Sequence, residues 1–351
     1  MERGRAPGRR RLRAGLSARV RRRRWILLPA LVAVIPALAA CAKPVGSTSV
    51  HNVAWVTTGA SVTLPGMDVT PVNLTRRHIG AKVQVGSMPA ALAYTPGGKG
   101  LLVVTQGDDE LHEIDPATHQ VVHEASVGVE PDAVTVAPGG TSGRGVALVA
   151  NLDSGSVTPV DLGTWRAGTP IAVGSQPVAI AVSVAASGGA TAFVADHGSN
   201  TVTPIDVATM TAGAAIPVGP GPQTIAAAPG EVLVGNFGNR TLTAINPTAL
   251  RAGGTVALPL NPTGIVVAPS GTTAYVCGGA AVVAVATFGL TVGPPVALPD
   301  VAQGIALSAD GATAWVTQQA GTLIPVALAA GTVGVPLHVG GHPSAVVIGP
   351  G

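Results

Sequence analysis

Short apolar segments, each ending at a polar or glycine-rich turn, recur along almost the whole chain. Typical examples are LLVVT (Leu101–Thr105), VALVA (Val146–Ala150) and TAFVA (Thr191–Ala195). Strands of this length, bounded by Gly, Pro, Asn and Asp, are typical of β proteins, and long helical patterns are few. The pattern therefore predicts an all-β fold.

The strands are organised by a repeat, which begins with a Val-Gly-x-x-Pro step. The steps are VGSMP (Val85–Pro89), VGVEP (Val127–Pro131), VGSQP (Val173–Pro177) and VGPGP (Val218–Pro222), with weaker copies LPLNP (Leu258–Pro262), LPDVA (Leu298–Ala302) and VGGHP (Val339–Pro343). Their fifth residues are 40–46 positions apart. A first strand follows each step, then a Gly-rich turn, a second strand, a polar turn, a third strand and a fourth. Four short strands per unit of this length predict a β-propeller blade.

The second strands carry a further motif, seen in Ala274-Tyr275-Val276-Cys277, Ala192–Asp196 and Val149-Ala150-Asn151, and a Val-x-x-Ile-Asp-x-x-Thr pattern follows in Val202–Thr209. These repeats resemble the YVTN β-propeller family over roughly residues 53–349. The resemblance implies a propeller fold and a scaffold, and it implies no particular activity.

The two ends of the repeat array predict the number of blades. Ala54–Thr58 and Val69–Leu74 match second and third strands, and 77–85 supplies a fourth, but no first strand precedes them. Ser344–Ile348 is a first strand with nothing after it. We therefore predict seven four-stranded blades, closed by the C-terminal strand joining the N-terminal blade, because closure removes the exposed sheet edges.

Two features of the third strands lead to local predictions. Prolines interrupt four of them, at Pro71, Pro159, Pro204 and Pro325. Because proline has no N–H, we expect a bulge there, or a position whose N–H would face away from the ladder. An Asp or Asn ends four third strands and is predicted to cap the next turn: Asp115, Asp161, Asp206 and Asn246. Ala286 and Ala327 stand at this place in the two weakest copies, where we expect altered lower turns.

The N-terminal segment differs from the rest of the chain. Eleven arginines precede residue 25, and an apolar run of 16 residues, Trp25–Ala40, follows them. That run is short for a transmembrane helix and typical of a secretory signal peptide. Leu38–Cys41 resembles the lipobox of bacterial lipoproteins, which implies lipidation of Cys41; an ordinary signal peptide with a chance cysteine is the alternative. The predicted organisation is signal peptide 1–40, tether 41–52 and propeller 53–351.

Removal of residues 1–40 reverses the charge of the chain. Nine basic and sixteen acidic residues remain, for a net charge of −7. With no basic stripe left, we predict no nucleic-acid binding, and we expect an exported monomer. Cys277 would be the one cysteine besides Cys41 and lies in an apolar strand, so we expect an inert, packed thiol.

Candidate binding residues lie on the face that carries the steps, which we call the upper face. Alternating strand direction places the turns between second and third strands there too, and the Gly-rich and Asp-capped turns on the lower face. Seven candidates flank the fifth residues of the steps: Glu130, Asp132, Gln176, Gln223, Asn261, Gln303 and His342. Asp196 and His197 are expected at the rim. With Ser199 they contain the residue types of a hydrolase triad, but adjacent turn residues rarely form such a relay.

The spacing of histidines and carboxylates predicts no metal site. The histidines around His112, including His119 and His123, are interpreted as solvated surface groups, and Asp108–Glu110 as a solvated turn. No cofactor is predicted, and an unknown metal stays an alternative.

Together these features predict a lipid-anchored propeller on the outer face of the bacterial cytoplasmic membrane. It would act as a non-catalytic scaffold that binds a protein or cell-envelope partner on its upper face. The alternative is a propeller enzyme, such as a lactonase-like hydrolase, a lyase or a dehydrogenase, with a site at the channel mouth. Such a site would use Glu130, Asp132 and His342, the charged or imidazole groups expected there.

Overall fold

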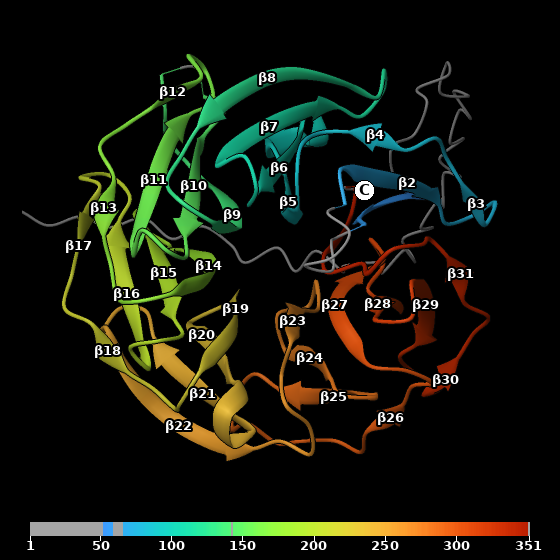
Figure 1. The fold of residues 1–351 in the computed structure, drawn as a ribbon. Coiled ribbons are helices and arrows are strands. Elements are labelled where there is room, and N and C mark those ends of the chain that lie inside the picture. Colours follow the sequence, from blue (N-terminus) through green and yellow to red (C-terminus); the bar gives the residue numbers. More distant parts are fainter. Residues whose placement is uncertain (1–51, 59–65, 142, 350–351) are drawn as a thin grey trace, which may run out of the picture. The chain divides into compact units, whose positions relative to one another are not determined.

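The computed structural model describes residues 52–58, 66–141 and 143–349. The chain divides into residues 1–45 and a compact unit, Gly46–Gly351, and the described residues belong to the second. The predicted signal peptide, Cys41 and nearly all of the tether lie outside them. The compact unit is a seven-bladed β-propeller, in which seven small antiparallel sheets are arranged around a ring (Figure 1). The predicted fold class is thereby confirmed.

Each sheet forms one blade, numbered here along the chain. Blade 1 contains β32 (Val346–Ile348), β1 (Val53–Thr57), β2 (Asp68–Asn73), β3 (His78–Ile79) and β4 (Val83–Gln84). Blade 2 contains β5 (Pro89–Tyr94), β6 (Leu101–Thr105), β7 (Glu110–Asp115) and β8 (Gln120–Ser126). Blade 3 contains β9 (Pro131–Ala137), β10 (Val146–Asn151), β11 (Ser156–Asp161), β12 (Arg166–Ala167) and β13 (Ile171–Ala172). Blade 4 contains β14 (Pro177–Val184), β15 (Ala190–Asp196), β16 (Thr201–Asp206), β17 (Thr211–Ala212) and β18 (Ile216–Pro217).

The remaining blades follow the same order. Blade 5 contains β19 (Pro222–Ala228), β20 (Glu231–Asn236), β21 (Thr241–Asn246) and β22 (Arg251–Ala257). Blade 6 contains β23 (Gly264–Val267), β24 (Thr273–Gly278), β25 (Ala281–Ala286) and β26 (Val296–Ala297). Blade 7 contains β27 (Ala302–Leu307), β28 (Thr313–Gln318), β29 (Thr322–Ala327), β30 (Thr332–Val333) and β31 (Leu337–His338). Two single 3-10 turns, η2 (Pro96–Gly98) and η3 (Phe237–Asn239), complete the described elements. Among the described residues, no helix is long and apolar enough to cross a membrane.

The core lies between neighbouring blades. The second strand of each blade is buried on both faces, and all five residues of β6 are buried. A strand buried on both faces reads as a continuous apolar run, which explains the uniform segments of the sequence. Val, Ala, Leu and Ile supply most of the packing, and Trp55 and Phe193 are the largest fully buried side chains. Cys277 belongs to this core at 0% exposure, and burial raises its pKa to about 12, as expected for an inert thiol.

The ring closes as predicted, because β32 pairs with β1 across almost the whole length of the chain. Trp55 lies opposite Val347 in the ladder, with Ala54 opposite Ile348. The Thr57 and Ser344 hydroxyls are 2.9 Å apart. Blade 1 is therefore built from both ends of the propeller.

The third-strand prolines face the outermost part of their blades. Each proline carbonyl accepts a hydrogen bond of 2.7–2.8 Å from a glycine N–H: Gly80 to Pro71, Gly168 to Pro159, Gly213 to Pro204 and Gly334 to Pro325. In an antiparallel ladder the N and C=O of one residue point to the same side, so the missing N–H also faces the fourth strand. The fourth strand is divided there into two short pieces, as in β17 and β18. The missing N–H therefore faces away from the ladder with the second strand and towards the break in the fourth strand, which is the second of the two predicted alternatives.

The turn caps are also confirmed. In each of the four turns the terminal Asp or Asn oxygen accepts hydrogen bonds from the N–H groups two and three residues later: Asp115, Asp161, Asp206 and Asn246. Ala286 and Ala327 lack this cap, but the altered lower turns expected there are not found. Both turns keep the length of the capped turns and a positive φ at their fourth residue, Leu290 and Gly331.

Candidate functional site at the upper face

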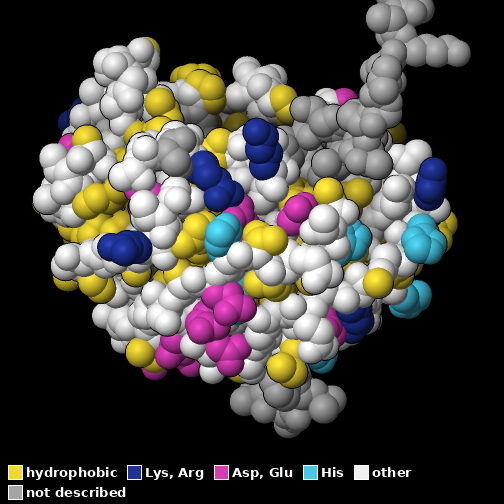
Figure 2. All heavy atoms as spheres, turned by 90° about the horizontal axis from the view of Figure 1, so that it is seen from above, with side chains coloured by type: hydrophobic (Ala, Val, Ile, Leu, Met, Phe, Trp, Pro, Cys, Tyr) yellow, Lys and Arg dark blue, Asp and Glu magenta, His cyan; other side chains and the backbone are white. Residues whose placement is uncertain are grey.

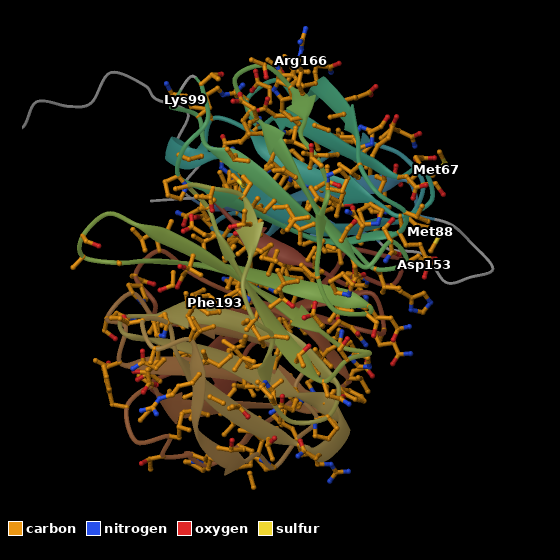
Figure 3. All side chains as sticks on the ribbon, turned by 90° about the vertical axis from the view of Figure 1, so that its left-hand side faces the viewer. Met67, Met88, Lys99, Asp153, Arg166 and Phe193 are labelled. Atoms are coloured by element: carbon orange, nitrogen blue, oxygen red, sulfur yellow. The ribbon has the colours of Figure 1, made fainter. Side chains whose placement is uncertain are left out.

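The upper and lower faces are as the strand directions predict. Met67, Met88 and Asp153 lie along one edge of the ring in Figure 3, and Lys99, from a Gly-rich turn, lies along the opposite edge. The steps and the turns between second and third strands therefore share one face. Any site built from the predicted residues belongs to this face.

Backbone hydrogen bonds fix each upper turn to the step beside it. The carbonyl of the fourth step residue accepts an N–H from the turn, at 2.8 Å from Leu152 to Glu130 and 2.9 Å from His197 to Gln176. Glu130 and Gln176 both have a φ of +52°, a left-handed conformation that non-glycine residues adopt infrequently. Both side chains are exposed. Backbone hydrogen bonds thus hold the steps and turns together, and neither side chain makes a hydrogen bond within the described part of the chain.

Many polar side chains of the upper turns bind backbone of the steps. The Asp109 carboxylate accepts the Glu130 N–H at 2.9 Å, the Ser154 hydroxyl accepts the Val129 N–H at 2.8 Å, and the Asn200 amide oxygen accepts the Gly221 N–H at 2.8 Å. These bonds join one blade to the next. These side-chain oxygens are used for hydrogen bonds within the fold, so they are poor candidates for ligand contacts.

Asp196 belongs to a buried structural position and does not line the rim, so that expectation is wrong. It is 0% exposed, and its Oδ2 accepts hydrogen bonds from Thr203 (2.6 Å) and Thr201 (3.3 Å). Asn151 and Asn236 occupy the equivalent ends of β10 and β20, also at 0% exposure, and bond to equivalent threonines. Asp196 is the last residue of β15 and is buried, and the exposed turn begins at the residue after it.

Burial raises the pKa of Asp196 to about 6, partly opposed by the hydrogen bonds from Thr203 and Thr201. Oδ1 is buried and has no hydrogen-bond partner among the described residues. The neighbouring Ser199 hydroxyl lies 2.6 Å from the Ser175 nitrogen and 3.0 Å from its hydroxyl. Asp196 and Ser199 are thus committed to separate structural bonds, as expected from the rejection of a triad.

A row of β-bulges positions the residue that follows the fifth residue of the step. In the ladder of β9 and β10, Pro131 pairs with Asn151 and Ala133 with Ala150, so Asp132 is the extra residue. The same shift places one extra residue in four further blades: Ala90, Val178, Gln223 and Gln303. A bulge re-aims one side chain out of the ladder and is common beside binding sites.

Three predicted residues, Asp132, Gln223 and Gln303, are therefore brought to equivalent places at the upper ends of the inner strands. All three are partly exposed. The Gln223 and Gln303 amides make no hydrogen bond to another residue in the part of the chain that the structure describes. We call these three side chains the bulge ring. Their free donors and acceptors are available to a polar ligand.

Asp132 is the charged member of the bulge ring. Its Oδ1 accepts a hydrogen bond of 2.7 Å from the Gln106 amide. Its pKa is raised to about 6, mainly by burial and also by the nearby Glu130 carboxylate, while the bond from Gln106 opposes the shift. Asp132 thus changes charge near neutral pH, a property found often at functional sites.

The other candidates lie outside the bulge ring. The Asn261 amide donates to the Phe237 carbonyl at 2.8 Å, and His342 Nδ1 lies 3.1 Å from the Gln319 carbonyl. His197 lies against the next step, where a β-carbon on Gly221 would be 3.2 Å from its ring. Glu130 and Gln176 are exposed, and their side chains make no hydrogen bond to another described residue.

The histidines of blade 2 are not all solvated surface groups, so that interpretation is wrong. His112 is 1% exposed and lies between the carboxylates of Glu110 and Glu124. His123 stacks on Trp165 with ring centroids 4.9 Å apart, and His119 meets Trp55 edge-on at 5.1 Å. Asp108 also has a structural role, since it accepts the Ser87 N–H. An alignment of the internal repeats would have shown His112 replacing a threonine.

The comparisons with known proteins support the fold. No family model matches the chain, and no curated protein matches its sequence. The resemblance to the YVTN family therefore stays a prediction.

Several solved structures share the architecture. A functionally unknown protein from Desulfotomaculum acetoxidans aligns with a TM-score of 0.73 and 16% identity, covering 86% of this chain and 100% of that chain. Kuenenia stuttgartiensis hydrazine synthase gives 0.66 and 20%, covering 75% and 90%. The dihydro-heme d1 dehydrogenase NirN, solved in complex with DHE, gives 0.61 and 12%, covering 88% and 77%. At these identities the likeness shows the fold alone, and by that fold the chain is a seven-bladed β-propeller.

Proposed function

We propose that this protein is an exported, lipid-anchored propeller that binds a polar partner of the cell envelope at the bulge ring. The observation that carries the proposal is the set of matching bulges that present Asp132, Gln223 and Gln303 at the upper face. Two amides and one carboxylate offer hydrogen bonds in both directions. This chemistry suits a peptide segment or a carbohydrate, both of which are rich in donors and acceptors.

The proposal of a scaffold rests on how the other polar groups of the upper face are used. Asp196, Ser199 and Asn200 bind strand or step atoms, so they are unavailable as an acid, a nucleophile or a positioning group. The anchor is proposed from the sequence of residues 22–41, in which basic residues, an apolar run and Cys41 follow one another.

Site-specific photo-crosslinking in intact cells tests the proposed surface. A photoreactive residue at position 223 or 303 should give a discrete crosslinked product, because the partner covers the bulge ring. The same residue at position 99, on the lower face, should not. Asp132→Ala should reduce the product at both upper positions. Equal products from positions 99 and 223, or none from either upper position, would contradict the proposal.

The anchor is tested in the same cells by fractionation. Cys41→Ala should move the protein from the membrane to the soluble fraction, because the proposed acyl chains would be lost. Cys277→Ala is the matched control, since that cysteine is buried in blade 6 and should leave the distribution unchanged. A protein that stays in the membrane without Cys41 would contradict lipid anchoring.

An enzyme is the second candidate, and one observation favours it. Asp132 has a pKa of about 6 beside a second carboxylate, Glu130, and so has the properties of a general acid or base. Two of the solved structures similar in fold are a hydrazine synthase and a dehydrogenase. An activity that follows the ionisation of Asp132, and that Asp132→Asn abolishes while the fold is kept, would establish this function. If Asp132→Ala reduces the crosslinked product and no such activity is found, the scaffold remains the proposed function.

A further inference from the structure

We propose that Glu110, His112 and Glu124 form a binding site for a divalent transition-metal ion on the outer part of blade 2. The three residues come from adjacent strands, two from β7 and one from β8. His112 and Glu124 are direct cross-strand partners, and Glu110 lies two residues before His112 on the same face of β7. The site is separate from the bulge ring and independent of the function proposed for it.

His112 is the centre of the site. It is 1% exposed, and its Nδ1 is buried without a hydrogen-bond partner among the described residues. Nε2 lies 3.2 Å from the Thr105 hydroxyl, which holds the ring in place. A buried polar nitrogen without a partner is costly, at about 1–3 kcal/mol, so its presence calls for an explanation.

The two carboxylates lie close to His112, on opposite nitrogens of its ring. Nε2 is 3.5 Å from Glu110 Oε2, and Nδ1 is 3.6 Å from Glu124 Oε1. Both are longer than a normal hydrogen bond. An ion can bind only one of these two nitrogens, and nitrogen and oxygen atoms bound tetrahedrally to one zinc ion are about 3.4 Å apart, given bonds of about 2.0–2.2 Å, so one carboxylate has to move towards that nitrogen. One ligand atom from each of the three residues lies within 4.8 Å of those of the other two.

The repeats of the chain supply an independent comparison. The place of His112 is held by threonine in three following blades, at Thr158, Thr203 and Thr243. The place of Glu110 is held by Ser156, Thr201 and Thr241. Thr255 of β22 corresponds to Glu124, since it pairs with Thr243 as Glu124 pairs with His112. Blade 2 thus exchanges small hydroxyl side chains for metal-ligand types at three adjoining positions at once.

The site is open to solvent on its carboxylate side. The Glu124 side chain is 60% exposed and that of Glu110 is 34% exposed. Figure 2, which views the ring from the side that carries β8, shows acidic side chains gathered in one patch with a histidine nearby. An ion can enter from this side, and the two flexible carboxylates can close on it.

The donor set indicates the class of metal. One imidazole and two carboxylates suit Zn²⁺ and related first-row ions, whereas Ca²⁺ and Mg²⁺ prefer oxygen ligands alone. Three protein ligands leave at least one coordination position for water or for a group from a partner. Asp108 is not included, because its carboxylate accepts the Ser87 N–H.

The test is a calorimetric titration of Zn²⁺ into the full chain, purified in detergent without a polyhistidine tag and stripped by a chelator. We expect saturable binding of one ion per chain. His112→Thr should weaken binding by about 100-fold or more, and Glu110→Ser and Glu124→Thr by about tenfold or more each. Each variant introduces the residue that other blades carry at that place, so the fold should be retained.

Two controls separate the site from other zinc ligands. His123→Ala and Cys41→Ala should bind Zn²⁺ as the unchanged protein does. Zn²⁺ should also raise the melting temperature of the unchanged protein and not that of Glu124→Thr, which alters an exposed side chain and cannot be confused with misfolding. Binding that is equal in the unchanged protein and in Glu124→Thr, or no saturable binding at all, would show that the cluster is only an ion-pair triad and would overturn the proposal.

Discussion

At the scale of single residues, Asp196 shows how one position of the repeat constrains its chemistry. Asn151 and Asn236 fill the same buried place in neighbouring blades and use the amide nitrogen to donate to threonine hydroxyls. Asp196 can only accept when ionised, and its Oδ1 has no partner among the described residues. Burial raises the pKa of Asp196 to about 6, so the ionised carboxylate is less stable here than in water.

Asp196→Asn should consequently stabilise the protein in a pH-dependent way. The pKa of Asp196 is about 6 in the folded protein and near 4 when unfolded, so folding is favoured by protonation and loses stability as the pH rises from about 4 to above 6. At pH 8 the variant should gain about 1–2 kcal/mol in the free energy of unfolding, and at pH 4 almost nothing. Chemical denaturation at the two pH values measures the difference.

Asn151→Asp is the reciprocal control and should lose stability at pH 8. Its carboxylate would face the Ser156 carbonyl, to which Asn151 now donates. Equal stability of Asp196→Asn at both pH values, or a loss at pH 8, would show that the ionised form is better accommodated than its burial indicates.

At the scale of elements, each third-strand proline is matched to a glycine across the blade. The glycine N–H donates to the proline carbonyl, and the proline ring lies close to the place that a β-carbon added to the glycine would take. A β-carbon on Gly334 would be 2.9 Å from Pro325 Cγ, closer than side chains tolerate. Proline and glycine thus form a pair that divides the fourth strand and keeps the outer edge of the blade irregular, which discourages edge-to-edge association.

Gly334→Ala should therefore destabilise the protein by about 1 kcal/mol, since the edge strand must move away from Pro325. Thermal denaturation measures the effect. Gly189→Ala is the matched control, because no atom lies within 4 Å of the added carbon there. In the double variant Gly334→Ala/Pro325→Ala the loss should be reduced, since the clash is gone. A loss of the same size in Gly189→Ala would contradict the pairing.

The strands and turns could be predicted because their signals are local. The step, the Gly-rich turn and the third-strand Asp each impose structure within a few residues, and each recurs. The bulge at Asp132 leaves no such signal, since it depends on how β9 and β10 align. The sequence pattern places Asp196 in the exposed turn, but that turn begins one residue later, and Asp196 is the buried end of β15. His112 was missed because one of its two carboxylate neighbours, Glu124, comes from the next strand, twelve positions further along the chain.

At the scale of the whole molecule, closure of the seven-bladed ring depends on the pairing of β32 with β1. Each inner strand packs against its neighbours, and β32 joins blades 7 and 2 as well as completing blade 1. Val346, Trp315 and Val56 belong to one buried cluster. Loss of β32 would expose this cluster and one edge of β1 together.

Deletion of residues 340–351 should lower the melting temperature by about 10 °C or more and expose hydrophobic surface to a dye, because several buried side chains lose their cover. A synthetic peptide of residues 340–351, added to the truncated protein, should restore part of the loss in proportion to its concentration. Identical melting of the truncated and intact proteins would contradict a closure that holds the ring together.

The pairing of β1 with β32 also sets an order in time. Chains are made from the N-terminus, so the residues of β1 exist long before those of β32, and the contacts between them are among the most distant in the sequence. Until β32 has been made, β1 has an unpaired edge, and blade 1 is incomplete. The ring therefore cannot close while the earlier blades emerge, and until β32 is available the unpaired edge of β1 is exposed to pairing with another chain.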